Sequence, residues 1–307
     1  MAFLDSISFY GQYSIQDRIL HNVVQFFDYG LLELGAFYNI TKGTTDKFNN
    51  DLSKLRTTDN KIFNGFKGGW IWESGINMKD SSINPPINIS GIYVDIIFFF
   101  FCSTSIGNGY HINYLDGQII FNTAIQKNSV VQLDYSTKFI HVALADTNRY
   151  RDAVSYYQNK NLLFINGSGL DGFNNKFSLP AVFIGVSKMT TTPIGLGSRD
   201  RYANATLNID IFCENPSDKK KISDIFYAAT EKSFKPYDVN RAILPISASG
   251  TLQNPAYTFP DLVKNYPHNY PFARFSDDFI LSNDNSMNLP IQHSNVRMII
   301  EFPVTIN

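Results

Sequence analysis

The side chains that could perform chemistry are scattered along this chain of 307 residues. Its five histidines never fall at i, i+4 spacing around a glutamate, so the zinc-protease motif is absent from the sequence. Neither a G-x-S-x-G nucleophile turn nor a Walker A phosphate loop occurs. Cys102 and Cys213 stand far apart in apolar runs, which is typical of buried thiols. The sequence therefore predicts neither a cofactor nor a metal site and favours a protein that is not an enzyme.

One glycine motif and one acidic group come nearest to a ligand site. Gly167 to Gly172 satisfies G-x-G-x-x-G, but Phe-Asn-Asn-Lys follows where a helix should begin, which favours a flexible turn over a dinucleotide loop. Asp277, Asp278 and Asp284 lie in an Asn/Ser-rich stretch without a repeating ligand spacing. We interpret these acids as solvated loop residues.

Basic side chains gather at two places where they could contact a partner. The first group flanks the Gly195-Leu-Gly197 turn and comprises Lys188, Arg199 and Arg201. Cations at a hairpin tip could line a channel that carries DNA, because neutralising phosphates requires little more than positioned charge; a solubilising tip is the alternative. The second group comprises Lys219, Lys220 and Lys221. It indicates either a solvated cluster or a contact with an acidic neighbouring subunit or a phosphate backbone.

Three aromatic residues form a further candidate contact group. Trp70, Trp72 and Tyr93 could stack on a sugar or a base. The alternative is the core, because aromatic residues that alternate within strands are more often buried.

Two helices are expected to position these groups. Ser14 and Asp17 resemble a capping box and begin a helix that reaches about Leu34, with apolar residues along one face. Asn215 and Pro216 begin the second helix, since Asn caps free N–H groups and Pro is tolerated at the first helical position. The three lysines 219–221 fall in its first turn, where the helix dipole disfavours cations.

A sheet is expected to carry both helices. Residues 202–213 alternate between apolar and polar along the strand, which predicts a half-buried strand. Residues 179–186 and 295–303 are expected to join it. We predict an α+β fold with a mixed or antiparallel sheet packed by two helices, formed by residues 1–40 and 155–307 as one discontinuous domain.

An all-β module is expected between the two halves of that domain. Residues 60–145 read as short antiparallel strands, with Asp116-Gly117 as a hairpin turn, and predict an inserted sandwich or barrel. Residues 41–59 read as a polar loop or arm. The Pro- and Asn-rich segment 244–295 is long for a structureless loop, and in an assembly it could wrap a neighbour.

Composition points to a protein covered by other subunits. Net charge is −1, charged residues make up 17%, and there are 26 Phe and 17 Tyr. This balance argues against a free nucleic-acid binder and suits burial in interfaces; codon bias in a low-GC genome is the alternative source of the aromatic residues. The first residues lack a signal-peptide pattern. The apolar run 92–102 is about half the length needed to span a bilayer, so we expect a soluble protein made in a cytoplasm.

Several segments resemble virion structural proteins of tailed bacteriophages. Ile19-Leu-His-Asn-Val-Val-Gln-Phe-Phe27, Leu179-Pro-Ala-Val-Phe-Ile184 and the strand-to-helix unit of residues 207–212 and 218–229 resemble the tail-terminator family of neck proteins. Residues 90–94, 110–121 and 130–135 are similar to a strand module common in phage virion proteins. Together, the elements to which these segments belong cover about half of the chain. The inserted module and the long segment 244–295 depart from the family pattern.

The resemblance implies a ring, expected to be hexameric, in the phage neck. Such a ring stops tail-tube polymerisation and meets the head connector, with tube, sheath or collar proteins as partners and with DNA in the lumen. The basic hairpin would face the lumen or the tube, and the strand module would face outward or contact sheath or collar proteins.

Two other functions are compatible with the sequence. A baseplate, tail-fibre or adhesion protein would use the aromatic module to bind a receptor or glycan. A carbohydrate-active enzyme would use two of Asp95, Asp116 and Asp134, although nothing in the sequence places those carboxylates opposite each other.

Overall fold

The structure is a computed structural model of the chain. It describes residues 14–46, 48–95, 97–100, 109–148, 150–151, 153–154, 179–195, 200–247, 249–253, 258–270, 272–283 and 291–304. These residues form a mixed α+β fold with sheets predominating, as the sequence predicts. Within the described part of the chain, no helix is long and apolar enough to cross a membrane.

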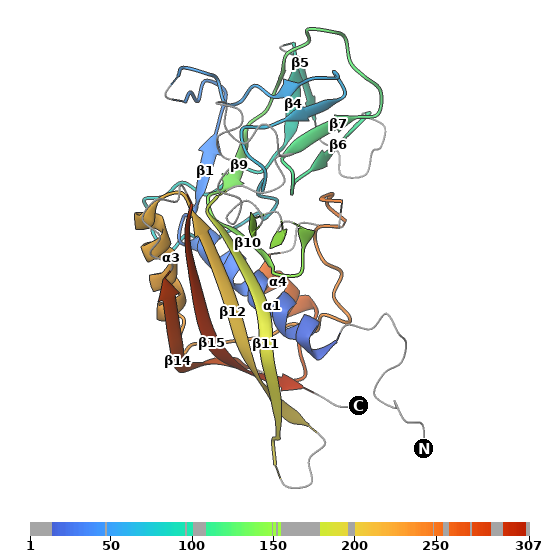
Figure 1. Cartoon of the computed structure of the whole chain (residues 1–307). Helices are drawn as coiled ribbons and strands as arrows, with labels where there is room; N and C mark the ends of the chain where they lie inside the picture. The colour runs from blue at the N-terminus through green and yellow to red at the C-terminus, as the bar shows by residue number, and fades with distance from the viewer. Residues whose placement is uncertain are drawn as a thin grey trace.

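A sheet of six strands forms the larger half of the molecule (Figure 1). Its spatial order is β10-β11-β12-β15-β14-β13. β10 runs parallel to β11, and all the other neighbours are antiparallel. The strands are β10 (His141–Leu144), β11 (Ala181–Pro193), β12 (Arg201–Cys213), β13 (Ser233–Phe234), β14 (Ala273–Asn283) and β15 (Gln292–Val304).

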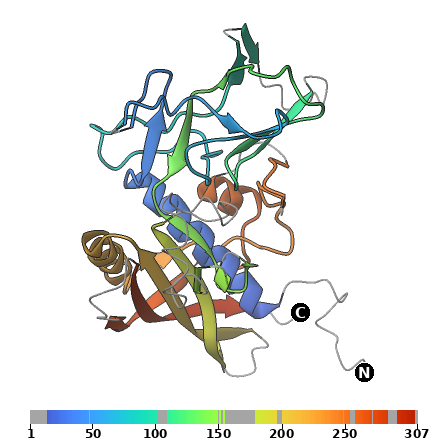
Figure 2. The ribbon, with the colours of Figure 1, turned by 45° about the horizontal axis from the view of Figure 1, so that its top comes forward.

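Three helices pack on one face of this main sheet, which we call the inner face. They are α1 (Ile15–Glu33), α3 (Pro216–Ala228) and α4 (Phe259–Asn265). Figure 2 shows α1 crossing the sheet diagonally. The predicted caps are confirmed: Ser14 and Asp17 form a capping box, and the Asn215 side chain accepts from the Ser217 amide with Pro216 at the helix start. The helix α4 was not predicted.

The inner face is apolar because alternate residues of the central strands point toward the helices. On β12 these are Ala203, Ala205, Leu207, Ile209 and Ile211, all fully buried. Their cross-strand neighbours on β15, such as Met298 opposite Leu207, are buried too. The predicted alternation of residues 202–213 is confirmed. Removing this much apolar surface from water is the main force holding the helices on the sheet.

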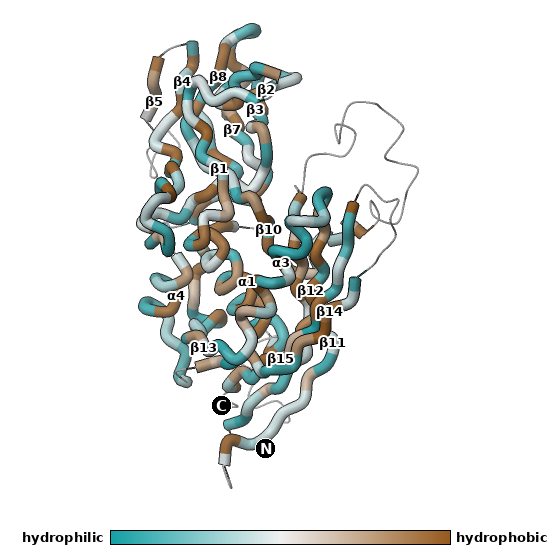
Figure 3. Tube along the Cα trace, turned by 90° about the vertical axis from the view of Figure 1, so that its left-hand side faces the viewer, coloured by the Kyte–Doolittle hydropathy of each residue, from teal (hydrophilic) through white to brown (hydrophobic). Residues whose placement is uncertain are grey.

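The β module lies beyond one end of the main sheet (Figure 1). It combines a pair β1-β9, a four-stranded sheet β2-β3-β7-β6 and a three-stranded sheet β5-β4-β8. Trp70, Tyr135 and Ile119 are among the fully buried residues of its separate core. Figure 3 shows hydrophobic residues running through both halves of the chain. The strands are β1 (Phe37–Ile40), β2 (Arg56–Thr57), β3 (Ile62–Asn64), β4 (Gly91–Val94), β5 (Ile97–Phe100), β6 (Tyr110–Asn113), β7 (Gln118–Phe121), β8 (Val131–Gln132) and β9 (Tyr135–Lys138).

The predicted hairpin of residues 110–121 is present as β6 and β7. Its register pairs Asn113 with Gln118, so the loop holds four residues rather than two. Gly117 has a positive φ of 66°, and a Cβ there would lie 2.5 Å from the Lys67 carbonyl oxygen. Glycine is therefore required at this turn on both counts.

The boundaries of the module differ from the prediction at both ends. Residues 141–144, expected to belong to it, form β10 and pair with β11 in the main sheet. At the other end β1 pairs with β9, so residues 37–40 belong with the module. The expected arm at 41–59 contains β2 and the buried Leu55.

The segment 244–295 is not a structureless loop. It contains α4 and β14, and its described residues 244–247 and 249–253, which we call the strap, return to the module. The Tyr114 amide donates to the Gly250 carbonyl at 2.8 Å, and Ile246 and Leu252 pack against the module core. The sequence allows such a segment to wrap a neighbour in an assembly; within one copy, the strap contacts its own module.

Candidate interaction surface

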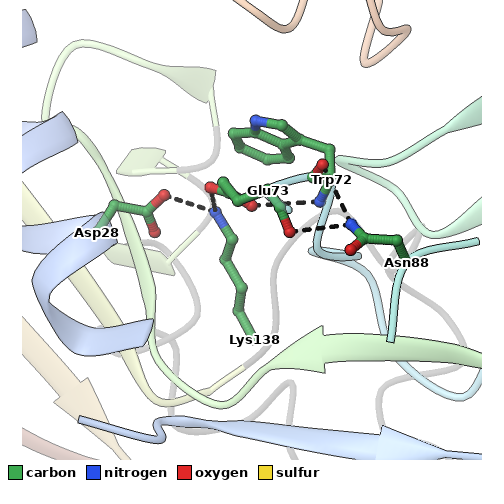
Figure 4. Close-up of polar contacts among 5 residues, drawn as sticks. All are labelled: Asp28, Trp72, Glu73, Asn88 and Lys138. Carbon is green, nitrogen blue, oxygen red and sulfur yellow. Dashed lines mark hydrogen bonds and ion pairs between the residues drawn. The ribbon is translucent and has the colours of Figure 1, made fainter. Parts of the chain in front are cut away.

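A buried ion cluster joins the module to the main sheet (Figure 4). Lys138 Nζ on β9 lies 2.5 Å from Asp28 Oδ2 on α1 and 3.0 Å from Glu73 Oε1 in the module. The three side chains are 4–8% exposed. The ammonium also lies over the Trp72 ring, 3.9 Å from its centroid, and Asn88 donates to the Trp72 and Glu73 carbonyls.

The charges of this cluster depend on each other. Burial raises the pKa of Glu73, and the nearby Lys138 only partly opposes that effect. Burial alone would lower the pKa of Lys138, but Asp28 and Glu73 outweigh it and raise the pKa. One cation thus serves two carboxylates away from water. The cluster connects α1 to the module and is too enclosed to meet a partner directly.

A second polar cluster lies on the other side of the main sheet, which we call the outer face. The Asp210 carboxylate on β12 accepts from Tyr150 Oη at 2.9 Å and from Asn295 Nδ2 at 3.0 Å. His293 Nε2 lies 2.9 Å from the same carboxylate, and its ring stacks on Phe212 at 4.8 Å between centroids. The cluster ties the chain after β10 to two central strands.

Hydrogen bonding controls the pKa values in the outer-face cluster. Burial would raise the pKa of Asp210, but the bonds from His293, Asn295 and Tyr150 together lower it. Burial and the bond to Asp210 raise the pKa of Tyr150 to about 12. Sequence analysis missed this cluster, because Asp210 reads as one polar residue of an alternating strand. Only the β12–β15 register, which pairs Asp210 with Asn295, reveals it.

The main sheet has two long strand edges without a strand partner among the described residues. β10 pairs with β11 only at Ala181–Ile184, and β13 pairs with β14 only at Ala273 and Arg274. Within the described part of the chain, the edges of β11 from Val186 and of β14 from Ser276 have no strand partner. Unpaired edges are natural sites for strand addition from another chain.

Exposed apolar side chains accompany the β14 edge. Ile280 and Leu281 are 59% and 41% exposed. Tyr227 on α3 is 61% exposed and contacts Phe279 edge to face at 5.3 Å between centroids. Leu281 and Tyr227 lie on the inner side of this edge and Ile280 on the outer side. Exposed apolar side chains on both sides of an unpaired strand are typical of interfaces.

The basic hairpin group is not brought together as one cluster. The register pairs Lys188 with Thr206, whereas Arg201 shares the parity of Ala203 and so lies on the opposite face. Arg201 donates to Thr191 Oγ1 at 3.2 Å. Arg199 lies outside the described residues.

The lysine run 219–221 divides into one buried and two exposed residues. Lys219 is 7% exposed, which corrects the expectation of a wholly solvated cluster. Lys220 and Lys221 are exposed, and Lys221 Nζ lies 4.0 Å from Asp218 Oδ1. Two of the three candidates are therefore accessible to a partner.

Two members of the aromatic group, Trp70 and Trp72, belong to the module core. Trp70 is fully buried and Trp72 is 8% exposed, so the two indoles cannot form an exposed stacking platform. Tyr93 is partly buried and contacts Phe98, with Lys42 Nζ 5.1 Å from its ring centroid. The core alternative accounts for Trp70 and Trp72.

The acidic candidates lie in separate turns. Asp95 accepts from the Val130 amide and Asp134 from the Lys42 amide, each at 2.7 Å. Asp116 accepts from Asn113 Nδ2 at 2.8 Å. These contacts fix loops and leave no facing pair of carboxylates among the three.

The remaining candidates are the acidic residues of β14 and the cysteines. Asp277 and Asp278 are exposed at a register shift in β14. Cys213 is buried, and desolvation raises the pKa of its thiol to about 12. In the residues that the structure describes, no three His, Cys, Asp or Glu side chains gather as a metal site. Three sequence candidates lie outside those residues: Cys102, the glycine motif 167–172 and Asp284.

No protein-family model matches the sequence, and no curated protein matches it.

Proposed function

We propose that this chain is a structural virion protein of a tailed bacteriophage. It forms a ring in the neck that terminates the tail and joins it to the head connector. The tail-terminator resemblance of residues 19–27, 179–184 and 207–229 is the starting point. The fold class, with two capped helices on a mixed sheet, agrees with that starting point at a coarse level.

The open, partly apolar edge of the main sheet is the observation that carries this proposal. Ile280, Leu281 and Tyr227 would be covered in an assembly, which removes an unfavourable apolar surface from water. Many copies of one modest contact give a closed ring when the rotation between copies closes. Hexamers are the proposed state, with tube, sheath or collar proteins on one side and head-connector proteins on the other.

The oligomeric state of the purified protein tests the proposal. Native mass measurement and negative-stain microscopy should show closed rings, either alone or after mixing with the tail-tube protein of the same phage. A chain that stays monomeric and also fails to bind the ends of tubes would contradict the neck assignment.

A receptor-binding part of the virion is the second candidate. Ile97 and Phe99, 64% and 44% exposed on β5 of the module, favour it because they form an apolar tip. This reading expects a monomer or trimer in the same native mass measurement. It also expects that Phe99→Ser abolishes binding to host cells, whether or not the protein forms rings.

A further inference from the structure

The two open strand edges of the main sheet match each other in direction. β11, β12, β15 and β14 alternate antiparallel across the sheet, so β14 runs antiparallel to β11. A second copy turned about an axis along the strands keeps the same strand directions. The β14 edge of one copy then meets the β11 edge of the next copy as an antiparallel pair.

The charges on the two edges are of opposite sign. Lys188 is exposed on the open part of β11, and Asp277 and Asp278 are exposed on the open part of β14. Pairing β11 with β11 would bring lysines together, and pairing β14 with β14 would bring aspartates together. These charges attract unlike edges at long range and disfavour both like-edge pairings, although Lys188 and Asp278 do not lie directly opposite each other when Ile280 is opposite Thr190.

The apolar side chains are also placed for such a pair. Leu281 is paired with Val296 and so lies on the inner face, where Met189 of β11 also lies. Ile280 is paired with Arg297 on the outer face. Side-by-side strands would therefore place Leu281 beside Met189 of the next copy and continue the apolar inner face.

We infer that copies of this chain join by strand addition, with β14 from Asp277 to Asn283 pairing antiparallel with β11 from Ser187 to Pro193 of the next copy. The inference deepens the proposed ring and rests on it for closure. The contact is heterologous, so it leaves one open edge of each kind until the ring closes.

The positions of the two edges fix how the copies are offset. Within one copy, Ile280 is paired with Arg297, Arg297 with Asn208, and Asn208 with Gly185, so Ile280 and Gly185 lie at the same height along the strands. At that level β11 is still close to β10, because a Cβ on Gly185 would lie 3.2 Å from the Ala145 Cβ. Pairing Ile280 with Thr190 instead shifts the next copy by about five residues, or ~17 Å at ~3.4 Å per residue. Such a stagger is what tilted strands in closed barrels require.

Disulfide trapping tests the pairing directly. All variants carry Cys102→Ser, and the buried Cys213 is kept. Because side chains alternate between faces, Ile280→Cys should cross-link to Thr190→Cys or Lys188→Cys, which lie on the same face. In one chain, either double variant should give a ladder of oligomers on oxidation, reversed by reductant. Ile280→Cys with Met189→Cys is the matched control, and we expect at least tenfold less ladder from it.

Charge reversal provides an independent readout without cysteines. Lys188→Glu should weaken association at low ionic strength, measured by analytical ultracentrifugation, and the effect should shrink as salt is added, because the charges act at long range. Adding Asp277→Lys and Asp278→Lys to the same chain should restore it. Lys61→Glu, an exposed lysine in the module, should leave association unchanged. Circular dichroism checks that each variant is folded.

The outcomes separate this inference from the proposed function. Rings in native mass without any same-face ladder would overturn the edge pairing and leave the neck ring standing. Ladders with open filaments in place of rings would support the pairing and contradict the ring. A monomer with no ladder, alone and with tube protein, would contradict both.

Discussion

Lys138 is a residue whose loss is expected to lower stability strongly. It supplies the one ammonium group to two buried carboxylates, Asp28 and Glu73, and these come from the two halves of the molecule. Removing one partner from a buried ion pair costs more than the pair contributes, because an uncompensated charge stays in a medium of low dielectric. The same reasoning does not extend to Lys79 and Glu33, which lie 3.9 Å apart with the lysine 62% exposed.

Lys138→Met should lower the free energy of unfolding by about 3–5 kcal/mol. Urea denaturation at neutral pH measures the change. Lys79→Met is the control, and we expect a loss below about 1 kcal/mol. The triple variant with Asp28→Asn and Glu73→Gln should recover much of the loss, because no charge is then left unpaired. Equal losses for the two single lysine variants would refute this account.

Asp210 acts at the scale of elements, since its hydrogen bonds connect β12 and β15 to the chain after β10. Its pKa is lowered in the folded state, so below the unfolded value of about 3.9 the unfolded chain binds more protons. The stabilisation is therefore present above that value and is lost as the pH falls through the folded pKa.

Asp210→Asn should lower the free energy of unfolding at pH 7 by about 1–3 kcal/mol, because a charge-assisted network is replaced by neutral bonds. Between about pH 5 and pH 3 the variant should lose less stability than the natural chain. Urea denaturation at a series of pH values checks both statements. Asp224→Asn, at an exposed position of α3, is the control and should keep the acid dependence of the natural chain.

Local patterns made some elements predictable. The strand 202–213 and the two helix starts follow from alternation and capping, which involve neighbours within four residues. β10 was not predictable as part of the main sheet, because residues 141–144 read as a continuation of the strand before them. Its parallel partner β11 begins 40 positions later, at Ala181. Pairing over that separation leaves no signal in a single sequence.

The candidate contact residues show the same division. Alternation around Trp70 and Trp72 is compatible with either a core or an exposed platform, and only the module core decides between them. The acid–lysine cluster was invisible because its members lie 45 to 110 positions apart. Lys219 reads as solvated in a run of three lysines, but the helix turns it toward the protein.

At the scale of the whole molecule, the strap connects the main-sheet half to the module, as the Lys138 ion cluster also does. Gly250 sits at its contact with the module, with a positive φ of 79°, and a Cβ there would lie 1.9 Å from Asn113 Oδ1. Any side chain at this position must displace the strap from the β6–β7 hairpin.

Gly250→Val should release the strap and raise the rate of proteolytic cleavage near residues 244–253 about tenfold, because local opening controls cleavage. Limited proteolysis with mass spectrometry locates the cut. Gly75→Val is the matched control: Gly75 has a positive φ of 69°, but nothing lies within 4 Å of its Cβ position. Similar cleavage of residues 244–253 in both variants would show that the clash at Gly250 is not responsible.

α1 and β15 share one core but lie far apart in the sequence, so the ribosome synthesises them at different times. The apolar face of α1 is made first, but Met298 and Ile300, which share its core, are made last. The module core can assemble early from residues 40–135. The apolar face of α1 stays exposed until β15 has been synthesised. Contacts of such long range are slow to form and leave intermediates prone to aggregation. We therefore expect nascent chains that end before residue 292 to depend on chaperones, whatever the stability of the finished protein.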